Sequence, residues 1–118
     1  MRITLAQLNP VVGDLRGNIS KLEKALIRAS GDSSDLLVLS ELFLVGYPPK
    51  DLLERRWFIQ QVKQAIEEVA KISKSYPETG ILFGAPLPTA KDIGKGFFNS
   101  AIMIQKGLIL STHHTSLL

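Results

Sequence analysis

The chain of 118 residues is long enough for one compact domain and too short for two. Its composition, with 45% hydrophobic and 21% charged residues, excludes an intrinsically disordered chain. The formal net charge of +3 is spread along the sequence with no basic cluster longer than Arg55-Arg56, so we expect no nucleic-acid binding. No cysteine is present, which excludes disulfides and a thiol nucleophile within these residues.

The N-terminal segment lacks the sequence pattern of a targeting signal. Its first residues are basic, but polar Gln7 and Asn9 interrupt it where a signal peptide would have an unbroken apolar core. No apolar run approaches the roughly 18 residues that are needed to cross a bilayer. We therefore expect a cytoplasmic protein that does not associate with membranes.

The first half of the chain predicts a strand, a helix and a second strand. Residues 2–8 alternate between apolar and mixed positions before an Asn-Pro pair, which is typical of a strand. From Asn18, the expected N-cap, apolar residues recur at steps of three and four until Gly31, as on one face of a helix. The unbroken apolar run at 36–39 indicates a short strand that is covered on both faces.

The second half continues with another helix and another strand. Apolar residues share one face between about 55 and 74, and the helix that they predict ends before Pro77. Residues 80–84 predict a buried strand, after which Pro86 and Pro88 are expected to force a loop.

A hairpin is expected near the end of the sequence. The segments 98–105 and 108–113 flank Lys106-Gly107, a two-residue connection of hairpin type. Helices that alternate with buried strands indicate an α/β fold, and the hairpin adds antiparallel strands to it. The sequence therefore predicts an α/β fold with a mixed sheet.

Glu41 is the first candidate for a chemical role. It follows the predicted strand at 36–39 almost directly, and catalytic groups of α/β folds tend to lie at the carboxyl ends of strands. A carboxylate in such an apolar setting can act as a general base. Judged by position alone, a structural or capping role is the more common one for a glutamate.

The residues around Glu41 carry a family resemblance. The segment 41–53 reads Glu-Leu-Phe-Leu-x-Gly-Tyr-Pro-Pro-x-Asp-Leu-Leu and resembles the nitrilase superfamily, most closely the glutamine-hydrolysing domain of the glutamine-dependent NAD synthetases. Its Tyr-Pro-Pro-x-Asp-Leu-Leu part separates these synthetases from other nitrilase relatives. Further segments that match the family occur in the same order along the chain, at 7–14, 17–18, 84–86 and 98–101. The resemblance therefore covers essentially the whole chain.

This resemblance implies an α-β-β-α sandwich, of which the chain forms a part. We expect residues 1–118 to be a single carbon–nitrogen hydrolase (nitrilase-like) domain that is incomplete at its C-terminal end, with the synthetase domain absent. A half sandwich leaves one face of its sheet uncovered, so we also expect a homo-oligomer.

The resemblance also implies a triad of glutamate, lysine and cysteine that hydrolyses glutamine. In the family the cysteine attacks the side-chain carbonyl, the glutamate transfers protons and the lysine stabilises the oxyanion. The ammonia passes to a synthetase domain that uses ATP and Mg in NAD biosynthesis, whereas no cofactor is expected in this chain. Glu41 corresponds to the general base and Tyr47 to a residue of the glutamine pocket, and Asn99 is a further candidate for substrate binding.

Two positions of the triad depart from the family pattern. The lysine is expected in a His-His-Lys sequence, but Thr115 follows His113 and His114 here and is not expected to replace it. The cysteine is expected beyond Leu118. The chain is therefore predicted to have no glutaminase activity of its own, and whether it is an enzyme by itself stays open.

Two other interpretations concern the same residues. An alternative to a hydrolase fragment is a non-catalytic nitrilase-like interaction module that self-associates through the exposed face of its sheet. A metal site at His113 and His114 is not expected, because adjacent strand residues point to opposite faces and no third ligand lies at a suitable spacing.

Overall fold

The computed structural model describes residues 1–46, 50–53, 55–88 and 97–117. Its elements are, in chain order, β1 (Ile3–Leu5), α1 (Leu15–Gly31), β2 (Leu36–Val38), α2 (Lys50–Leu53), α3 (Arg56–Ser73), β3 (Gly80–Pro88), β4 (Phe97–Gln105) and β5 (Leu108–Leu117). Within these ranges, no helix has the length and apolar character that a membrane crossing requires.

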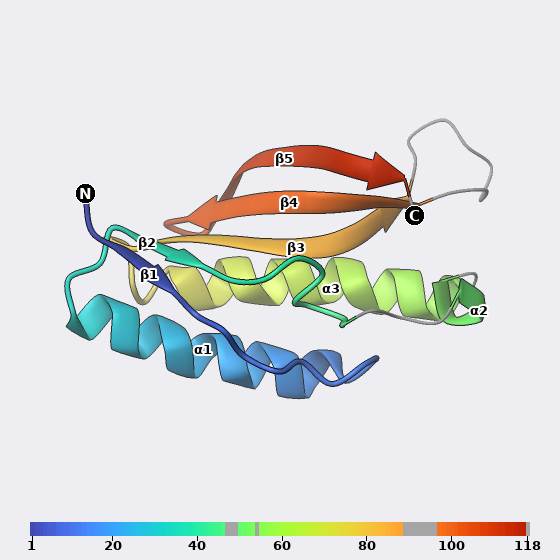
Figure 1. The fold of residues 1–118 in the computed structure, drawn as a ribbon, viewed down its shortest axis with the longest axis horizontal. Helices are drawn as coiled ribbons and strands as arrows, with labels where there is room; N and C mark the ends of the chain where they lie inside the picture. The colour runs from blue at the N-terminus through green and yellow to red at the C-terminus, as the bar shows by residue number, and fades with distance from the viewer. Residues whose placement is uncertain (47–49, 54, 89–96, 118) are drawn as a thin grey trace.

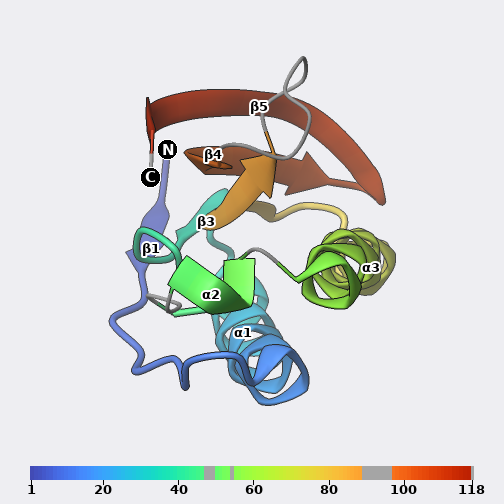
Figure 2. The same cartoon turned by 90° about the vertical axis from the view of Figure 1, so that its right-hand side faces the viewer.

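The strands form one mixed sheet with the long helices on one side of it. Their order across the sheet is β1-β2-β3-β4-β5; the first three are parallel, whereas β4 and β5 are each antiparallel to the strand before them. Both long helices, α1 and α3, lie on the same side of this sheet (Figure 1 and Figure 2). The predicted α/β fold with a mixed sheet is confirmed.

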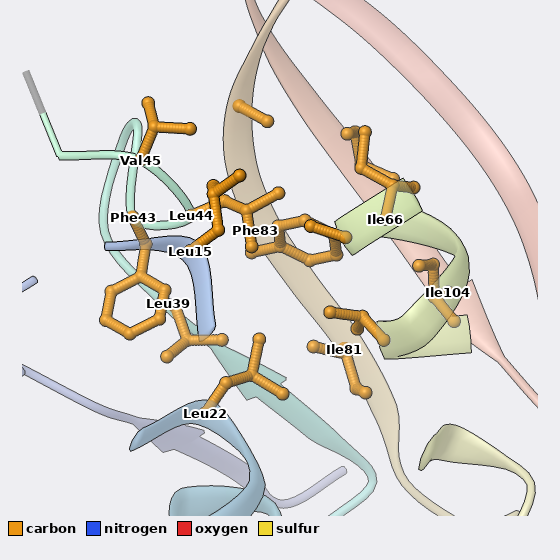
Figure 3. Close-up of a cluster of buried hydrophobic side chains, with 14 of the residues drawn as sticks. Leu15, Leu22, Leu39, Phe43, Leu44, Val45, Ile66, Ile81, Phe83 and Ile104 are labelled. Atoms are coloured by element: carbon orange, nitrogen blue, oxygen red, sulfur yellow. The ribbon is translucent and has the colours of Figure 1, made fainter. Parts of the chain in front are cut away.

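The core lies between the helices and the sheet. Leu22 and Leu26 of α1 and Phe58 of α3 are at most 1% exposed. They belong to one buried cluster with Ile81 and Phe83 of β3, part of which Figure 3 shows. Each side chain of this size contributes about 1.5–3 kcal/mol when it is fully buried, so the apolar faces of the helices account for their packing on the sheet.

Asn18 links two loops to α1 from inside the core. The helix begins at Leu15 with Asp14 as its N-cap, so the predicted N-cap at Asn18 is wrong. The fully buried Asn18 side chain donates from Nδ2 to the carbonyl oxygens of Val11 and Leu44, and its Oδ1 accepts from the Val11 amide. These bonds explain why a polar side chain can lie here, because a buried amide without partners is unfavourable.

Several strand ends differ from the sequence-based expectation. β1 is three residues long instead of covering 2–8, and β5 extends beyond 113 to Leu117. β3 runs through Pro86 and Pro88, which were expected to force a loop. β2 pairs with β3 only as far as Leu82, so no described strand pairs with the edge of β3 on which these prolines lie. The N–H groups that proline lacks are therefore not needed there for the hydrogen bonds of the sheet.

The β4–β5 hairpin turns at the predicted pair of residues. Lys106 and Gly107 have φ angles of 56° and 82°. Both lie in the left-handed region that a two-residue turn of this type requires, and glycine adopts that region without a steric cost. The predicted hairpin is confirmed.

Replacing Asn18 by alanine is expected to lower the free energy of unfolding by about 3 kcal/mol, because the buried polar groups of Val11 and Leu44 lose their partner. Urea denaturation measures this loss. Ser20→Ala, on the exposed side of the same helix, is the matched control and should change the stability by less than about 0.5 kcal/mol. An Asn18→Ala variant as stable as the original chain would show that these hydrogen bonds do not hold the loops.

Candidate active site

The strand-end loop, residues 40–46, follows β2 and folds back against β3. The amide of Leu44 donates to the carbonyl of Gly84 at 3.2 Å, which ties the loop to β3. Within the loop, the amide of Gly46 donates to the carbonyl of Leu42 at 2.8 Å. All residues from 42 to 46 are buried, so this loop is a packed extension of the core.

Gly84 sets how closely the strand-end loop approaches β3. A Cβ atom at this position would lie 2.5 Å from the main-chain nitrogen of Leu42 and 3.2 Å from the Cα of Glu41. The first distance is far below van der Waals contact, so no side chain fits at Gly84. Leu42 has a φ of 54°, a left-handed conformation that turns the chain at this contact. The contact and the turn together place Glu41 beside β3.

Glu41 is joined to β4 through Asn99. The Nδ2 of Asn99 donates to the Oε1 of Glu41 at 2.5 Å, across a separation of 58 residues in the chain. Asn99 is 3% exposed and lies opposite Pro86 of β3. Glu41 itself is exposed, so the expected apolar setting of its carboxylate is wrong.

A pocket of about 230 Å³ lies beside Glu41. It is bounded by the ends of β2 and β3, by β4 and by β5, and its polar residues are Ser40, Glu41, Asn99, Ser100 and Thr115. The described lining contains neither a lysine nor a cysteine. A pocket at the carboxyl ends of parallel strands is the usual place for a ligand in an α/β fold.

Thr115 reaches this pocket from a bulge in β5. The pairing shifts between Asn99 with Ser116 and Ser100 with His114, so Thr115 is the extra residue of the bulge. Its Oγ1 donates to the main-chain carbonyl of Asn99 at 2.6 Å. The hydroxyl of Thr115 therefore stabilises the bulge.

His114, the residue before Thr115, contacts two residues of β4. The Nδ1 of His114 lies 2.7 Å from the Oγ of Ser100, and its ring stacks on Phe98 with the centroids 4.5 Å apart. In the parts of the chain that the structure describes, no group of three or more potential metal ligands lies together.

The structure brings together three of the residues that the sequence singled out. Glu41, Asn99 and Thr115 line the same pocket, whereas Tyr47 lies outside the described residues. Sequence reasoning did not identify Gly84 as a determinant of the site, although the family match at 84–86 is an available signal. The contact of Gly84 with the strand-end loop depends on the fold and has no local pattern.

The arrangement can carry out proton transfer. The carboxylate of Glu41 can take up and return a proton to a group bound in the pocket, and the amide of Asn99 is a neutral donor beside it. The described lining supplies neither a thiolate nucleophile nor an ammonium group for an oxyanion.

Comparisons with known proteins identify the family and agree with the fold. The carbon–nitrogen hydrolase family matches residues 2–118. Glutamine-dependent NAD(+) synthetases of Synechocystis sp. and Thermotoga maritima are both 38% identical to the chain, over 98% and 96% of its length, while the chain spans 21% and 19% of theirs. The structure of an amidase from Nesterenkonia sp. matches with a TM-score of 0.83 and 25% identity, covering 98% of this chain and 42% of the amidase.

Gly84→Ala is expected to destabilise the chain by about 1–3 kcal/mol, because the added methyl group overlaps the main chain of the strand-end loop. Thermal or urea unfolding measures the change. The control is Gly31→Ala at the end of α1, where a Cβ meets nothing within 4 Å and the substitution should be neutral or slightly stabilising. Equal stability of the two variants would contradict the close approach at Gly84.

Proposed function

This chain belongs to the carbon–nitrogen hydrolase family, and we propose that it is part of the glutaminase domain of a glutamine-dependent NAD synthetase, with Glu41 as the general base. The observation that carries the proposal is the position of Glu41 at the carboxyl end of β2, beside a pocket and bonded to Asn99. The identity of 38% to two glutamine-dependent NAD synthetases supports the choice of glutamine as the substrate.

In this proposal the pocket takes the side-chain amide of glutamine. Glu41 accepts the proton of a nucleophile that attacks the amide carbon, and it returns the proton to the departing ammonia. The nucleophile is a cysteine outside these 118 residues, which contain none. The ammonia then serves an amidation that depends on ATP and Mg in a separate synthetase domain.

Thr115 leaves the site of this chain incomplete. Where the family resemblance implies a lysine, Thr115 offers a neutral hydroxyl whose proton is donated to the carbonyl of Asn99. Loss of one donor to the developing oxyanion costs about 3 kcal/mol, which corresponds to a rate lower by roughly 100-fold. Because these residues also contain no cysteine nucleophile, we expect the isolated chain to release no ammonia from glutamine.

A chimera tests the proposal. The chain replaces the aligned segment of the Thermotoga maritima synthetase, an alignment that covers 96% of this chain. With Thr115→Lys, the chimera is expected to form NAD from glutamine. With the original threonine, the glutamine-dependent rate should be at least about 100-fold lower, because the charged donor is missing.

The controls of this experiment separate folding from glutaminase chemistry. Formation of NAD from free ammonia should be similar in both chimeras and shows that the synthetase part is intact. Adding Glu41→Gln to the Thr115→Lys chimera should abolish the glutamine-dependent rate alone. A Thr115→Lys chimera that uses ammonia but not glutamine would contradict the proposed function.

The open face of the sheet favours a second candidate function, which is self-association as a non-catalytic interaction module. Leu37 of β2 is fully buried under the helices, whereas Ile3 and Leu5 of β1 alternate to the other face and are 51% and 74% exposed. Val38 and Leu82 are only partly buried on that same face. Apolar side chains that gather on one face commonly mark a contact surface, so we expect a homo-oligomer.

Analytical ultracentrifugation tests this second function. The chain at micromolar concentration is expected to sediment as a dimer or larger species, and Leu5→Asp should shift it toward the monomer by burying a charge in the contact. Ile27→Asp is the matched control, because Ile27 is 49% exposed on α1, away from the open face. A well-folded original chain that sediments as a monomer would rule out self-association through the sheet.

A further inference from the structure

Asn99 is a buried polar residue whose side chain is directed at the Glu41 carboxylate. Its exposure is 3%, and its Nδ2 donates to the Glu41 Oε1 at 2.5 Å. An ionised carboxylate only accepts hydrogen bonds, so the nitrogen of the amide must be the atom that faces it. Because the amide does not titrate, Asn99 can orient the carboxylate without competing for its proton.

We propose that Asn99 is the positioning residue of the site, which holds the Glu41 carboxylate in the orientation for proton transfer, and that Thr115 fixes the main chain from which Asn99 reaches it. The inference rests on the proposed function, since it assigns a role in the same reaction. Positioning of the base is an alternative to the substrate-binding role that the sequence suggested for Asn99.

The energies involved are sufficient for this role. A hydrogen bond to a charged group is stronger than one between neutral groups, so it can offset the conformational entropy that is lost when a glutamate side chain is ordered. The bond from Asn99 can therefore hold one orientation of Glu41, although Glu41 is exposed to solvent. Orientation has a large effect on rate, because a displacement of about 1 Å lowers the rate of a positioned reaction by roughly 100-fold.

Thr115 holds Asn99 from the other side. The bulge in β5 interrupts the pairing at Asn99, and the Oγ1 of Thr115 donates to the Asn99 carbonyl at 2.6 Å. The hydroxyl thereby compensates for the disturbed ladder at the residue that contacts Glu41. Asn99 is thus held at its main-chain carbonyl by Thr115 and contacts the carboxylate of Glu41 through its side-chain amide.

Ser100 provides a matched comparison for Asn99. It is the next residue on β4 and is 1% exposed. Its Oγ contacts the carbonyl of Phe98 and the Nδ1 of His114 and so serves the sheet, not Glu41. A variant at Ser100 therefore removes a buried hydrogen bond of the same strand without removing the contact to the carboxylate.

NMR spectroscopy of the full 118-residue chain tests the inference directly. In Asn99→Leu, which keeps the branched shape of the side chain and removes the donor, the carboxylate carbon signal of Glu41 should shift at neutral pH. Ser100→Ala should leave that signal unchanged. In the reciprocal variant Glu41→Ala, the side-chain amide protons of Asn99 should exchange faster with water, and this readout decides the question if Asn99→Leu does not fold.

The contribution of Thr115 is tested on the same strand. Thr115→Val should shift the side-chain amide signals of Asn99, because it removes the hydroxyl that bonds the Asn99 carbonyl. Thr112→Val, at another exposed position of β5, should not shift them. Equal effects of the two variants would overturn the role of Thr115.

The Thr115→Lys chimera lacks the Thr115 hydroxyl, so it tests the side chain of Asn99 alone and distinguishes orientation of the base from substrate binding. Asn99→Leu in this protein should lower kcat for glutamine by roughly 10- to 100-fold with little change in KM, whereas Thr112→Val, outside the pocket lining, should change neither. A higher KM with an unchanged kcat would overturn the positioning role in favour of substrate binding, as would an unchanged Glu41 signal in Asn99→Leu. Failure of the chimera to use glutamine would count against the proposed function alone, since the NMR signals still report on the contact.

Discussion

The close approach of two main chains at Gly84 is the constraint on which the candidate site depends. Without a side chain at Gly84, the strand-end loop packs directly on β3, with Leu42 in a left-handed turn. The same loop is held from the helix side, because Asn18 of α1 donates to the carbonyl of Leu44. Glu41 therefore belongs to a segment that is fixed both by a strand and by a helix, which is how loops that carry functional groups are usually supported.

The second half of the site comes from the antiparallel part of the sheet. β4 brings Asn99 to the carboxylate of Glu41, and the bulge in β5 brings Thr115 to Asn99. A position at which the family resemblance implies a charged lysine thus takes part in a structural hydrogen bond in this chain. Thr115 therefore contributes a hydrogen bond to the sheet at the position where the resemblance implies a charged group.

The sequence predicted those features that depend on local pattern. Periodic apolar residues located α1 and α3, the Lys106-Gly107 pair located the hairpin, and the position of Glu41 after a short apolar run located the strand end. The N-cap at Asn18 was wrong because the partners of that side chain are in two distant loops. The proline at 86 was misjudged because the free edge of β3 depends on where β2 stops, and the same kind of tertiary dependence hid the bulge in β5.

The candidate site requires that the strand-end loop holds Glu41 against Asn99 in solution. The most direct measurement is the nuclear Overhauser effect between the γ-protons of Glu41 and the side-chain amide protons of Asn99 in the unmodified chain. A strong cross-peak is expected, together with slow hydrogen exchange of the Leu44 amide, which donates to Gly84. Absence of the cross-peak with fast exchange of that amide would show that the loop does not hold Glu41 in this position.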